Sequence, residues 1–165
     1  MATAPSAPVH PEPVEHADLA SLATRLTGEL HFDRTMRTLY ATDASEYQEL
    51  PVAVALPKTE ADIRELIAFS NAHGLGLIPR TAGTSLAGQV VGHGIVVDLG
   101  RYLNRIVATD PTKRRVRVQP GVVRNELNLA LKPHNLFLTP ETSTANRAMI
   151  GGMLGNNSCG ANPTV

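Results

Sequence analysis

The stretch of sequence that decides the fold is Pro79-Arg80-Thr81-Ala82-Gly83-Thr84-Ser85-Leu86-Ala87-Gly88-Gln89. It lies between two apolar runs, residues 75–78 and 95–99, which we predict to be strands, the first of them buried. A loop with two glycines, two hydroxyls and little bulk can turn its backbone N–H groups toward one anion. Arg80 adds a permanent positive charge beside the loop. The stretch therefore predicts a site for the pyrophosphate of a nucleotide cofactor.

Two better-known phosphate-binding loops do not fit this stretch. A Walker A loop requires G-x-x-x-x-G-K-[ST], but Gln89 and Val90 follow Gly88 where Lys and Ser or Thr are required. This makes phosphoryl transfer a weak alternative. A Rossmann fingerprint requires G-x-G-x-x-G at the start of a helix, and no such spacing occurs here. A phosphate cradle of another type and a plain glycine-rich turn both remain open.

The composition of the whole chain excludes several classes of protein. Its 165 residues have room for one domain or part of one. The 15 basic and 15 acidic residues cancel, which argues against nucleic acid or an anionic membrane as a partner. The chain contains no apolar run of about 20 residues that would span a membrane and no signal-peptide pattern. Together with a single cysteine, Cys159, the lack of a membrane span and of a signal-peptide pattern predicts a cytoplasmic protein. The six histidines show no metal-ligand spacing.

The chain divides into three predicted parts. Residues 1–16 hold four prolines and are predicted to be a flexible tail. Residues 17–50 are predicted to form a helix, capped by Asp18 and continuing through Leu30, and then a polar segment from residue 33. That segment either wraps the domain or contacts a cofactor. The third part, residues 51–165, carries the glycine-rich motifs.

A β-strand, an α-helix and a second strand precede the glycine loop. Residues 51–57 form the first predicted strand, and Thr59 caps the helix, with Asp62 completing a capping box. Gly74 stands where the helix is expected to end. The predicted buried face of this helix consists of Ile63, Leu66 and Ile67. Such a βαβ unit predicts a small parallel layer.

After the loop the pattern becomes more antiparallel. Residues 95–99, 105–109 and 114–119 are predicted strands, and a helix with Leu127 and Leu131 on its buried face starts at Val123. Residues 136–138 are predicted to form a short strand. Arg115 and Arg117 alternate with Val116 and Val118, which is typical of a strand with one solvated face. The fold class predicted from the pattern is α+β.

The last informative stretch, residues 150–160, contains four glycines with Asn and Ser between them. We predict that these residues permit close approach of the backbone to a ligand. Asn side chains there can bond a flat heteroaromatic edge with both donor and acceptor. Cys159 is interpreted as a small residue beside the ligand, because no His lies near it in a nucleophile pattern.

Several motifs together resemble one known family. In chain order they are PRTAGTSLAGQ, VVDLGRYLNRI, VQPGV, PETST and IGGMLGNNSCG. This order resembles the PCMH-type FAD-binding domain of FAD-linked oxidases, a group that contains D-lactate dehydrogenases and the glycolate oxidase flavoprotein subunit. The likeness covers residues 37–159 and is greatest to large bacterial members fused to an iron–sulfur portion. It implies the PCMH-type fold, incomplete at its C-terminus.

The resemblance implies a set of residues that bind FAD. The loop that wraps the pyrophosphate would be Arg80, Thr81, Ala82, Gly83, Thr84 and Ser85, continued by Gly88 and Gln89. The segment beside the flavin and ribityl chain would be Pro140, Glu141, Thr142 and Ser143. The positions that close over the cofactor would be Gly151, Gly152, Asn156 and Gly160.

One of these positions departs from the family pattern. Thr81 stands where many relatives have glycine, so it would be strained if it adopted a positive φ. The loop has no histidine of the kind that attaches a covalent flavin, so FAD is expected to bind non-covalently.

The resemblance also implies an activity. Relatives oxidise a D-2-hydroxy acid of the lactate, glycolate or 2-hydroxyglutarate type and pass the electrons to an iron–sulfur or quinone acceptor, which can place them peripherally at the inner membrane. The chain is interpreted as a fragment of such an enzyme, inactive alone, with catalytic residues beyond Val165 and no metal site of its own. The alternative is a non-catalytic dinucleotide-binding module or an inactive fragment.

Overall fold

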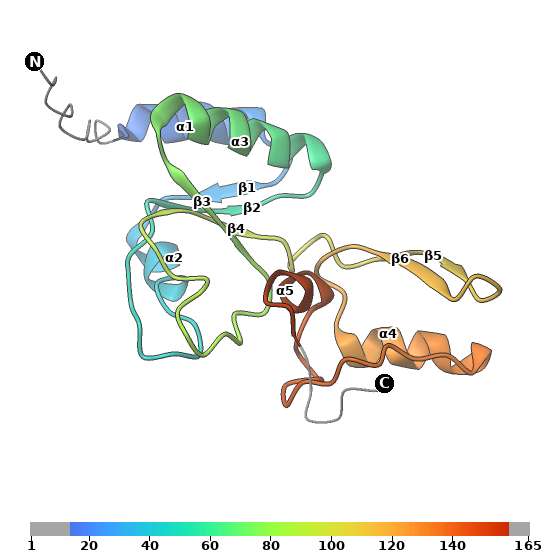
Figure 1. Cartoon of the computed structure of the whole chain (residues 1–165). Helices are drawn as coiled ribbons and strands as arrows, with labels where there is room; N and C mark the ends of the chain where they lie inside the picture. The colour runs from blue at the N-terminus through green and yellow to red at the C-terminus, as the bar shows by residue number, and fades with distance from the viewer. Residues whose placement is uncertain (1–13, 159–165) are drawn as a thin grey trace, which may run out of the picture.

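The computed structural model describes residues 14–158, and Figure 1 shows them as two lobes joined near helix α5. The predicted tail therefore lies almost entirely outside the described residues, as do Cys159 and Gly160. The elements are α1 (His16–Arg25), β1 (Glu29–His31), α2 (Arg34–Leu39), β2 (Ala53–Leu56), α3 (Glu60–His73), β3 (Gly76–Arg80), β4 (Gly94–Asp98), β5 (Ile106–Asp110), β6 (Arg115–Val118), α4 (Arg124–Leu131), the 3-10 helix η1 (Lys132–His134) and α5 (Ile150–Gly155).

The first lobe is built on a four-stranded sheet with the strand order β1-β2-β4-β3. Strands β2, β4 and β3 are parallel, which confirms the predicted small parallel layer, and β1 joins β2 antiparallel. Strand β4 corresponds to residues 95–99, which were predicted to belong to the more antiparallel part, so that assignment was wrong. Helices α1 and α3 lie side by side over one face of the sheet (Figure 1). The core between them consists of Leu19, Leu22, Ala53, Ala55, Leu66, Phe69, Ile95 and Val97.

Helix α3 begins and ends where its local chemistry predicts. Thr59 Oγ1 accepts the Asp62 N–H at 3.1 Å, and Asp62 Oδ2 accepts the Thr59 N–H at 3.0 Å. Gly74 ends the helix with a φ of 63°. The buried face differs from the prediction, because Ile67 is 46% exposed. Leu66 is buried as predicted, together with Phe69, and Ile67 lies one position around the helix from them.

Strand β3 is only partly buried, so the prediction of a buried strand before the glycine loop was wrong. It lies at the edge of the sheet, and both Gly76 and Pro79 are exposed. An edge position also explains why proline is tolerated there, since its missing N–H would face away from the neighbouring strand. The central strand β2, by contrast, is buried along its whole length.

Two predictions for the N-terminal part were also wrong. Helix α1 starts after Glu15 rather than at Asp18, and Leu30 belongs to strand β1, where it pairs with Ala55. Helix α1 ends at Arg25, and the chain then passes close to β2 at Gly28, where an added Cβ would lie 2.3 Å from the Leu56 carbonyl oxygen.

The predicted irregular segment from residue 33 contains a short helix, α2. Asp33 caps it by accepting the Met36 N–H at 3.1 Å. The helix has no buried residue, so the sequence carries no apolar periodicity that would reveal it.

The second lobe is an antiparallel β5–β6 hairpin above helix α4 (Figure 1). This confirms the predicted antiparallel layer, and the core of the lobe includes the predicted Leu127 and Leu131. Residues 136–138 are not a strand, because the Leu138 N–H is taken by the Asn128 Oδ1 at 2.7 Å rather than by another strand.

Residues 150–155 form helix α5, for which the glycine-rich sequence contained no signal. Two of its first N–H groups have distant acceptors: Ile150 donates to the Val122 carbonyl at 2.9 Å and Gly151 to the Pro120 carbonyl at 2.8 Å. A Cβ at Gly151 would lie 2.5 Å from the Pro120 Cβ, so this glycine permits close packing inside a helix.

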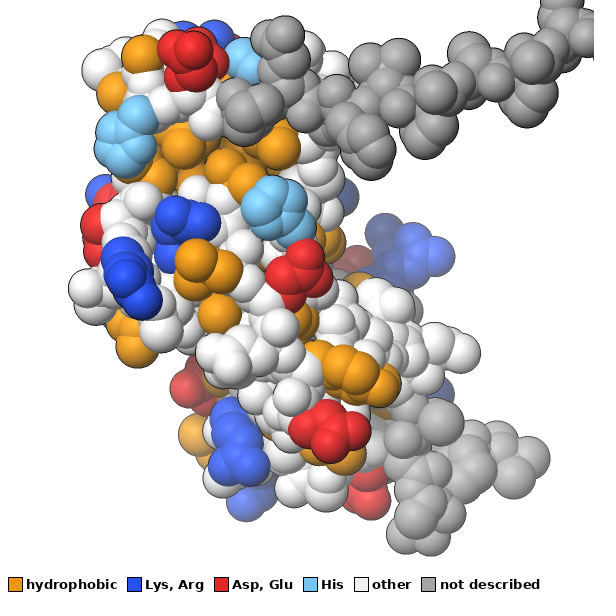
Figure 2. All heavy atoms as spheres, turned by 90° about the vertical axis from the view of Figure 1, so that its left-hand side faces the viewer, with side chains coloured by type: hydrophobic (Ala, Val, Ile, Leu, Met, Phe, Trp, Pro, Cys, Tyr) orange, Lys and Arg blue, Asp and Glu red, His pale blue; other side chains and the backbone are white. Residues whose placement is uncertain are grey.

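The surface agrees with the neutral balance of the sequence. Figure 2 shows basic and acidic side chains interspersed over one face of the molecule. Among the helices of residues 14–158, none combines the length and the apolar character that crossing a bilayer requires.

Candidate cofactor site

The glycine loop starts at the carboxyl end of β3 and returns to the start of β4. Gly83 and Gly88 adopt φ values of 63° and 70°, a region that favours glycine. Thr81 does not adopt a positive φ, since the non-glycine residues with positive φ in the described part of the chain are Arg114, Asn135 and Asn157. The strain considered for Thr81 is therefore absent.

The backbone N–H groups of residues 82–85 are available for a ligand. None of the hydrogen bonds found within residues 14–158 uses these N–H groups. Consecutive N–H donors around a glycine with positive φ are the basis of an anion-binding concavity. This part of the loop has the chemistry that a pyrophosphate requires.

The Arg80 guanidinium lies against the loop and is held by the segment before β2. Its Nη1 donates to the Thr42 carbonyl at 2.6 Å and to the Tyr40 carbonyl at 3.4 Å. A Cβ at Gly83 would come within 2.5 Å of the Arg80 Nη2. Arg80 thus braces the loop through its hydrogen bond to Thr42, 38 residues away in the sequence. No local sequence signal reveals this contact.

Ser85 also acts within the loop. Its Oγ accepts the Ala87 N–H at 3.4 Å and the Gln89 N–H at 3.3 Å. Burial raises the pKa of Asp43, but hydrogen bonds from the Ser45 hydroxyl and N–H help to outweigh it, so that pKa lies below its usual value. Asp43 follows Thr42, whose carbonyl holds Arg80, although sequence reasoning did not single it out as a site residue.

A second contact from the same segment reaches the end of β4. Tyr40 Oη donates to Asp98 Oδ2 at 2.6 Å, and Asp98 Oδ1 accepts the Gly100 N–H at 2.7 Å. Burial and the hydrogen bond to Asp98 raise the pKa of the Tyr40 phenol. This bond fixes the segment that holds Arg80.

We expect Tyr40→Phe to lower the free energy of unfolding by about 1.5–3 kcal/mol, because the phenol donates to a charged acceptor. The folded-state pKa lies above the unfolded value, so this contribution is fully present below about pH 10 and is lost as pH rises through the folded-state pKa. Urea unfolding of both proteins at increasing pH measures the difference. Tyr47→Phe, at an exposed tyrosine, should change nothing. A constant difference up to pH 12 would contradict the prediction.

Helix α5 contacts the glycine loop directly. Gln89 Nε2 donates to Asn156 Oδ1 at 2.9 Å, and a Cβ at Gly152 would lie 2.7 Å from Thr81 Oγ1. The structure thus brings together two predicted cofactor motifs that are 67 residues apart. The sequence predicted their common ligand but not the helix that joins them.

The third predicted motif, residues 140–143, lies against helix α4. Glu141 and Ser143 are exposed, whereas the Thr142 Oγ1 is a buried atom without a hydrogen-bond partner. Among the hydrogen bonds of residues 14–158, none joins this segment to the glycine loop. The fourth predicted position of the last motif, Gly160, lies outside the described residues.

These features fit a ligand that carries a pyrophosphate. The loop offers free N–H groups to a pyrophosphate, and a Cβ at Gly83 would crowd Arg80. The Asp43 Oδ2 and the Thr142 Oγ1 are buried oxygens without partners in the described residues. Buried polar atoms normally have partners, so both are available to a ligand or to ordered water. The fold and the loop together define a domain that holds a nucleotide cofactor.

The chain belongs to the family of FAD binding domains, which matches residues 51–164. It is 42% identical over 139 residues to D-2-hydroxyglutarate dehydrogenase of Haemophilus influenzae, with 79% of this chain and 14% of that protein covered. It is 30% identical over 147 residues to glycolate oxidase subunit GlcD of Bacillus subtilis, with 87% and 31% covered. The chain therefore spans less than a third of the length of these relatives.

Solved structures agree on the fold. The structure of alkyldihydroxyacetonephosphate synthase matches 92% of this chain and 31% of its own, with a TM-score of 0.78 and 18% identity. The structure of p-cresol methylhydroxylase matches 89% and 30%, with a TM-score of 0.68 and 17% identity. The predicted α+β fold of the PCMH type is confirmed, and FAD is confirmed as the cofactor of the family.

Proposed function

We propose that this chain is the FAD-binding portion of a flavin-dependent oxidoreductase that oxidises a D-2-hydroxy acid. The observation that carries the proposal is the loop between β3 and β4, with its free N–H groups and its closure by α5. The family match supports the cofactor, and relatives named for 2-hydroxyglutarate and glycolate support the substrate class. We further propose that an iron–sulfur or quinone acceptor takes the electrons.

The proposed cofactor-binding unit comprises residues 51–165, together with the bracing contacts of residues 40–45. Residues 80–85, Gly88 and Gln89 hold the pyrophosphate, mainly through backbone N–H groups. Residues 140–143 lie along the flavin side, and Gly151, Gly152, Asn156 and Gly160 close over the cofactor. FAD, when bound, would supply the electron acceptor for oxidation of the substrate alcohol. The protein's part is to bind FAD non-covalently and to orient it.

The test is a visible absorption spectrum of the purified chain after incubation with FAD and desalting. We expect a retained flavin band near about 450 nm, because the cradle is formed by residues within this chain. Mg-ATP should not compete at micromolar concentration, since the loop lacks the Walker lysine. Absence of retained FAD would contradict the proposed cofactor role of this chain.

The substrate class is tested with the complete polypeptide to which this chain corresponds. Under anaerobic conditions, D-2-hydroxyglutarate, D-lactate or glycolate should bleach the flavin band, and the L-enantiomer of a chiral acid should not. A flavin that stays bound but is bleached by none of these acids would support a non-catalytic dinucleotide-binding module instead.

A further inference from the structure

Arg124 occupies a position that elementary electrostatics disfavours. It is the first residue of α4, its N-cap Val123 makes no side-chain cap, and the arginine is only 8% exposed. A cation at a helix N-terminus opposes the helix dipole, and a buried charge is costly unless it is paired and hydrogen-bonded. A residue that breaks a local rule in this way needs a compensating interaction.

The compensation comes from the backbone of the segment before Thr142. Arg124 Nε donates to the Pro140 carbonyl at 2.6 Å, and Nη2 reaches the Leu138 carbonyl at 3.4 Å. The nearest carboxylate, that of Glu141, is 3.9 Å away and belongs to a side chain that is 59% exposed. An exposed and distant ion pair contributes little. The guanidinium group of Arg124 therefore serves mainly to hold the backbone carbonyls of Pro140 and Leu138 in place.

The same helix holds this segment at further points. Asn128, one turn along α4, accepts the Leu138 N–H at 2.7 Å and donates to the Leu138 carbonyl at 3.4 Å. The Arg124 N–H donates to the Ala148 carbonyl at 2.9 Å. Residues 138–142 contain no helix or strand, so these bonds replace the regular pairing that would otherwise fix their shape.

We infer that Arg124 is a positioning residue, which sets the backbone of residues 138–142 so that the unpartnered Thr142 hydroxyl faces the flavin portion of FAD. The inference rests on the proposed function, because the ligand of that segment is the FAD proposed above. Arg124 itself stays in contact with protein carbonyls and does not touch the cofactor. Its removal should therefore affect the flavin half of FAD and spare the pyrophosphate half.

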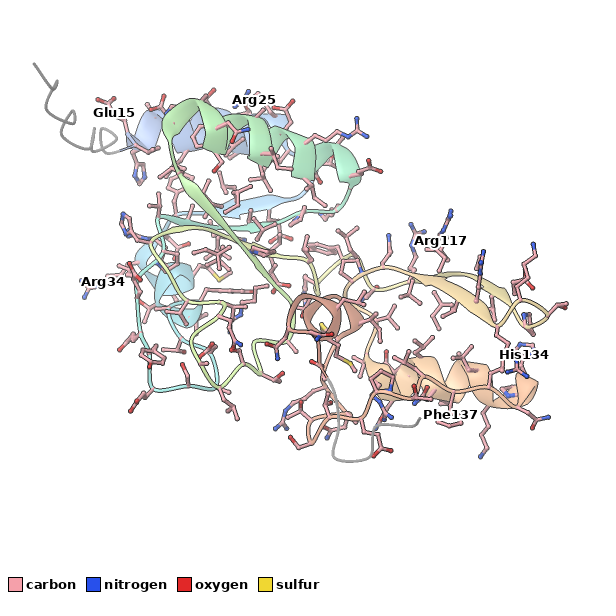
Figure 3. The ribbon with its side chains drawn as sticks, in the orientation of Figure 1. Glu15, Arg25, Arg34, Arg117, His134 and Phe137 are labelled. Carbon is pink, nitrogen blue, oxygen red and sulfur yellow. The ribbon has the colours of Figure 1, made fainter. Side chains whose placement is uncertain are left out.

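The experiment compares Arg124→Met and Arg124→Lys with the unaltered 165-residue chain. The matched control is Arg117→Met, because Figure 3 shows Arg117 on the hairpin face turned away from α4. For each protein the affinities for FAD and for ADP are measured by calorimetry, with the visible circular dichroism of bound FAD and the amide hydrogen exchange of residues 138–148.

We expect Arg124→Met to weaken FAD binding at least tenfold while ADP binding changes less than twofold. The circular dichroism of bound FAD should change, and exchange should rise within residues 138–142 but not in β2 or β4. Arg124→Lys keeps the charge but loses the fork, so it should restore only part of the affinity. Arg117→Met should match the unaltered chain.

Two results would overturn the inference while leaving the proposed function intact. One is equal loss of FAD and ADP binding with a collapsed thermal transition, which would make Arg124 a folding residue only. The other is unchanged FAD affinity and circular dichroism in both Arg124 variants. Failure of the unaltered chain to bind FAD would overturn the proposed function, and the inference with it. The unaltered chain thus separates the two failures.

Discussion

Replacing Gly83 with valine should abolish FAD retention, with affinity at least about a hundredfold weaker, or about 2.7 kcal/mol. Gly83 has a φ of 63°, where a non-glycine residue costs on the order of 1–3 kcal/mol and a β-branched one is a genuine outlier. The new Cβ would also lie 2.5 Å from the Arg80 Nη2. Either the loop backbone moves, or Arg80 leaves the Thr42 carbonyl. The first change displaces the N–H groups proposed to face the pyrophosphate, and the second removes the contact that braces the loop.

The matched control is Gly76→Val, because Gly76 lies in β3 with open space where a Cβ would stand. That variant should retain FAD as the unaltered chain does, and valine suits a strand. Fluorescence titration of FAD measures the affinities, and far-ultraviolet circular dichroism shows that both variants are folded. Unchanged FAD affinity in a folded Gly83→Val protein would exclude this loop as the pyrophosphate site.

The second large effect concerns stability. Asp62 is 2% exposed, and its carboxylate accepts the backbone N–H groups of Thr27 at 2.8 Å, Lys58 at 2.8 Å and Thr59 at 3.0 Å. Asp62→Ala would leave three N–H groups without this acceptor, so we expect a loss of about 3–5 kcal/mol in the free energy of unfolding. Urea denaturation measures it. That loss is a large share of the roughly 5–15 kcal/mol typical of a domain.

The control for Asp62 is Glu65→Ala on the same helix. Glu65 pairs with Arg25 at 3.3 Å, but both side chains are about half exposed, so this loss should stay below about 1 kcal/mol. Similar losses in the two variants would show that the Asp62 carboxylate does not join α3 to the start of β1.

The Asp62 contribution should also depend on pH. Burial raises the pKa of Asp62, but the three backbone N–H groups together outweigh it, so its pKa lies below its ordinary value of 3.8. A lowered folded-state pKa gives stability that is present above the unfolded pKa and is lost as pH falls through the folded pKa. The difference in stability between the unaltered chain and Asp62→Asn should therefore shrink below about pH 4. A constant difference down to pH 2 would contradict this account.

The elements that the sequence predicted well are those whose chemistry is local. Thr59 and Asp62 cap α3 within four residues, and Gly74 ends it with its own backbone. The positive φ values of Gly83 and Gly88 in the glycine loop are likewise determined by the residue itself. In each case the residue type and its immediate neighbours determine the conformation.

The elements that the sequence did not predict depend on distant partners. Helix α5 is fixed by carbonyls of residues 120–122, and the Arg80 fork by the carbonyl of Thr42. Leu30 lies outside the helix because it pairs with Ala55 of β2, 25 residues further along the chain. Arg124 did carry a usable signal, since a basic residue at the start of a predicted helix conflicts with the helix dipole. The pattern alone could not say which segment resolves that conflict.

The contact between Gln89 and Asn156 bears on how the protein is made. The first lobe has its own core, built from residues between Leu19 and Val97, and parts of a chain made early generally fold first. The glycine loop is therefore displayed by the growing chain before α5 has been synthesised. FAD capture should consequently follow the synthesis of residue 156. A message that ends before codon 156 should yield a chain whose first lobe folds but which stays colourless.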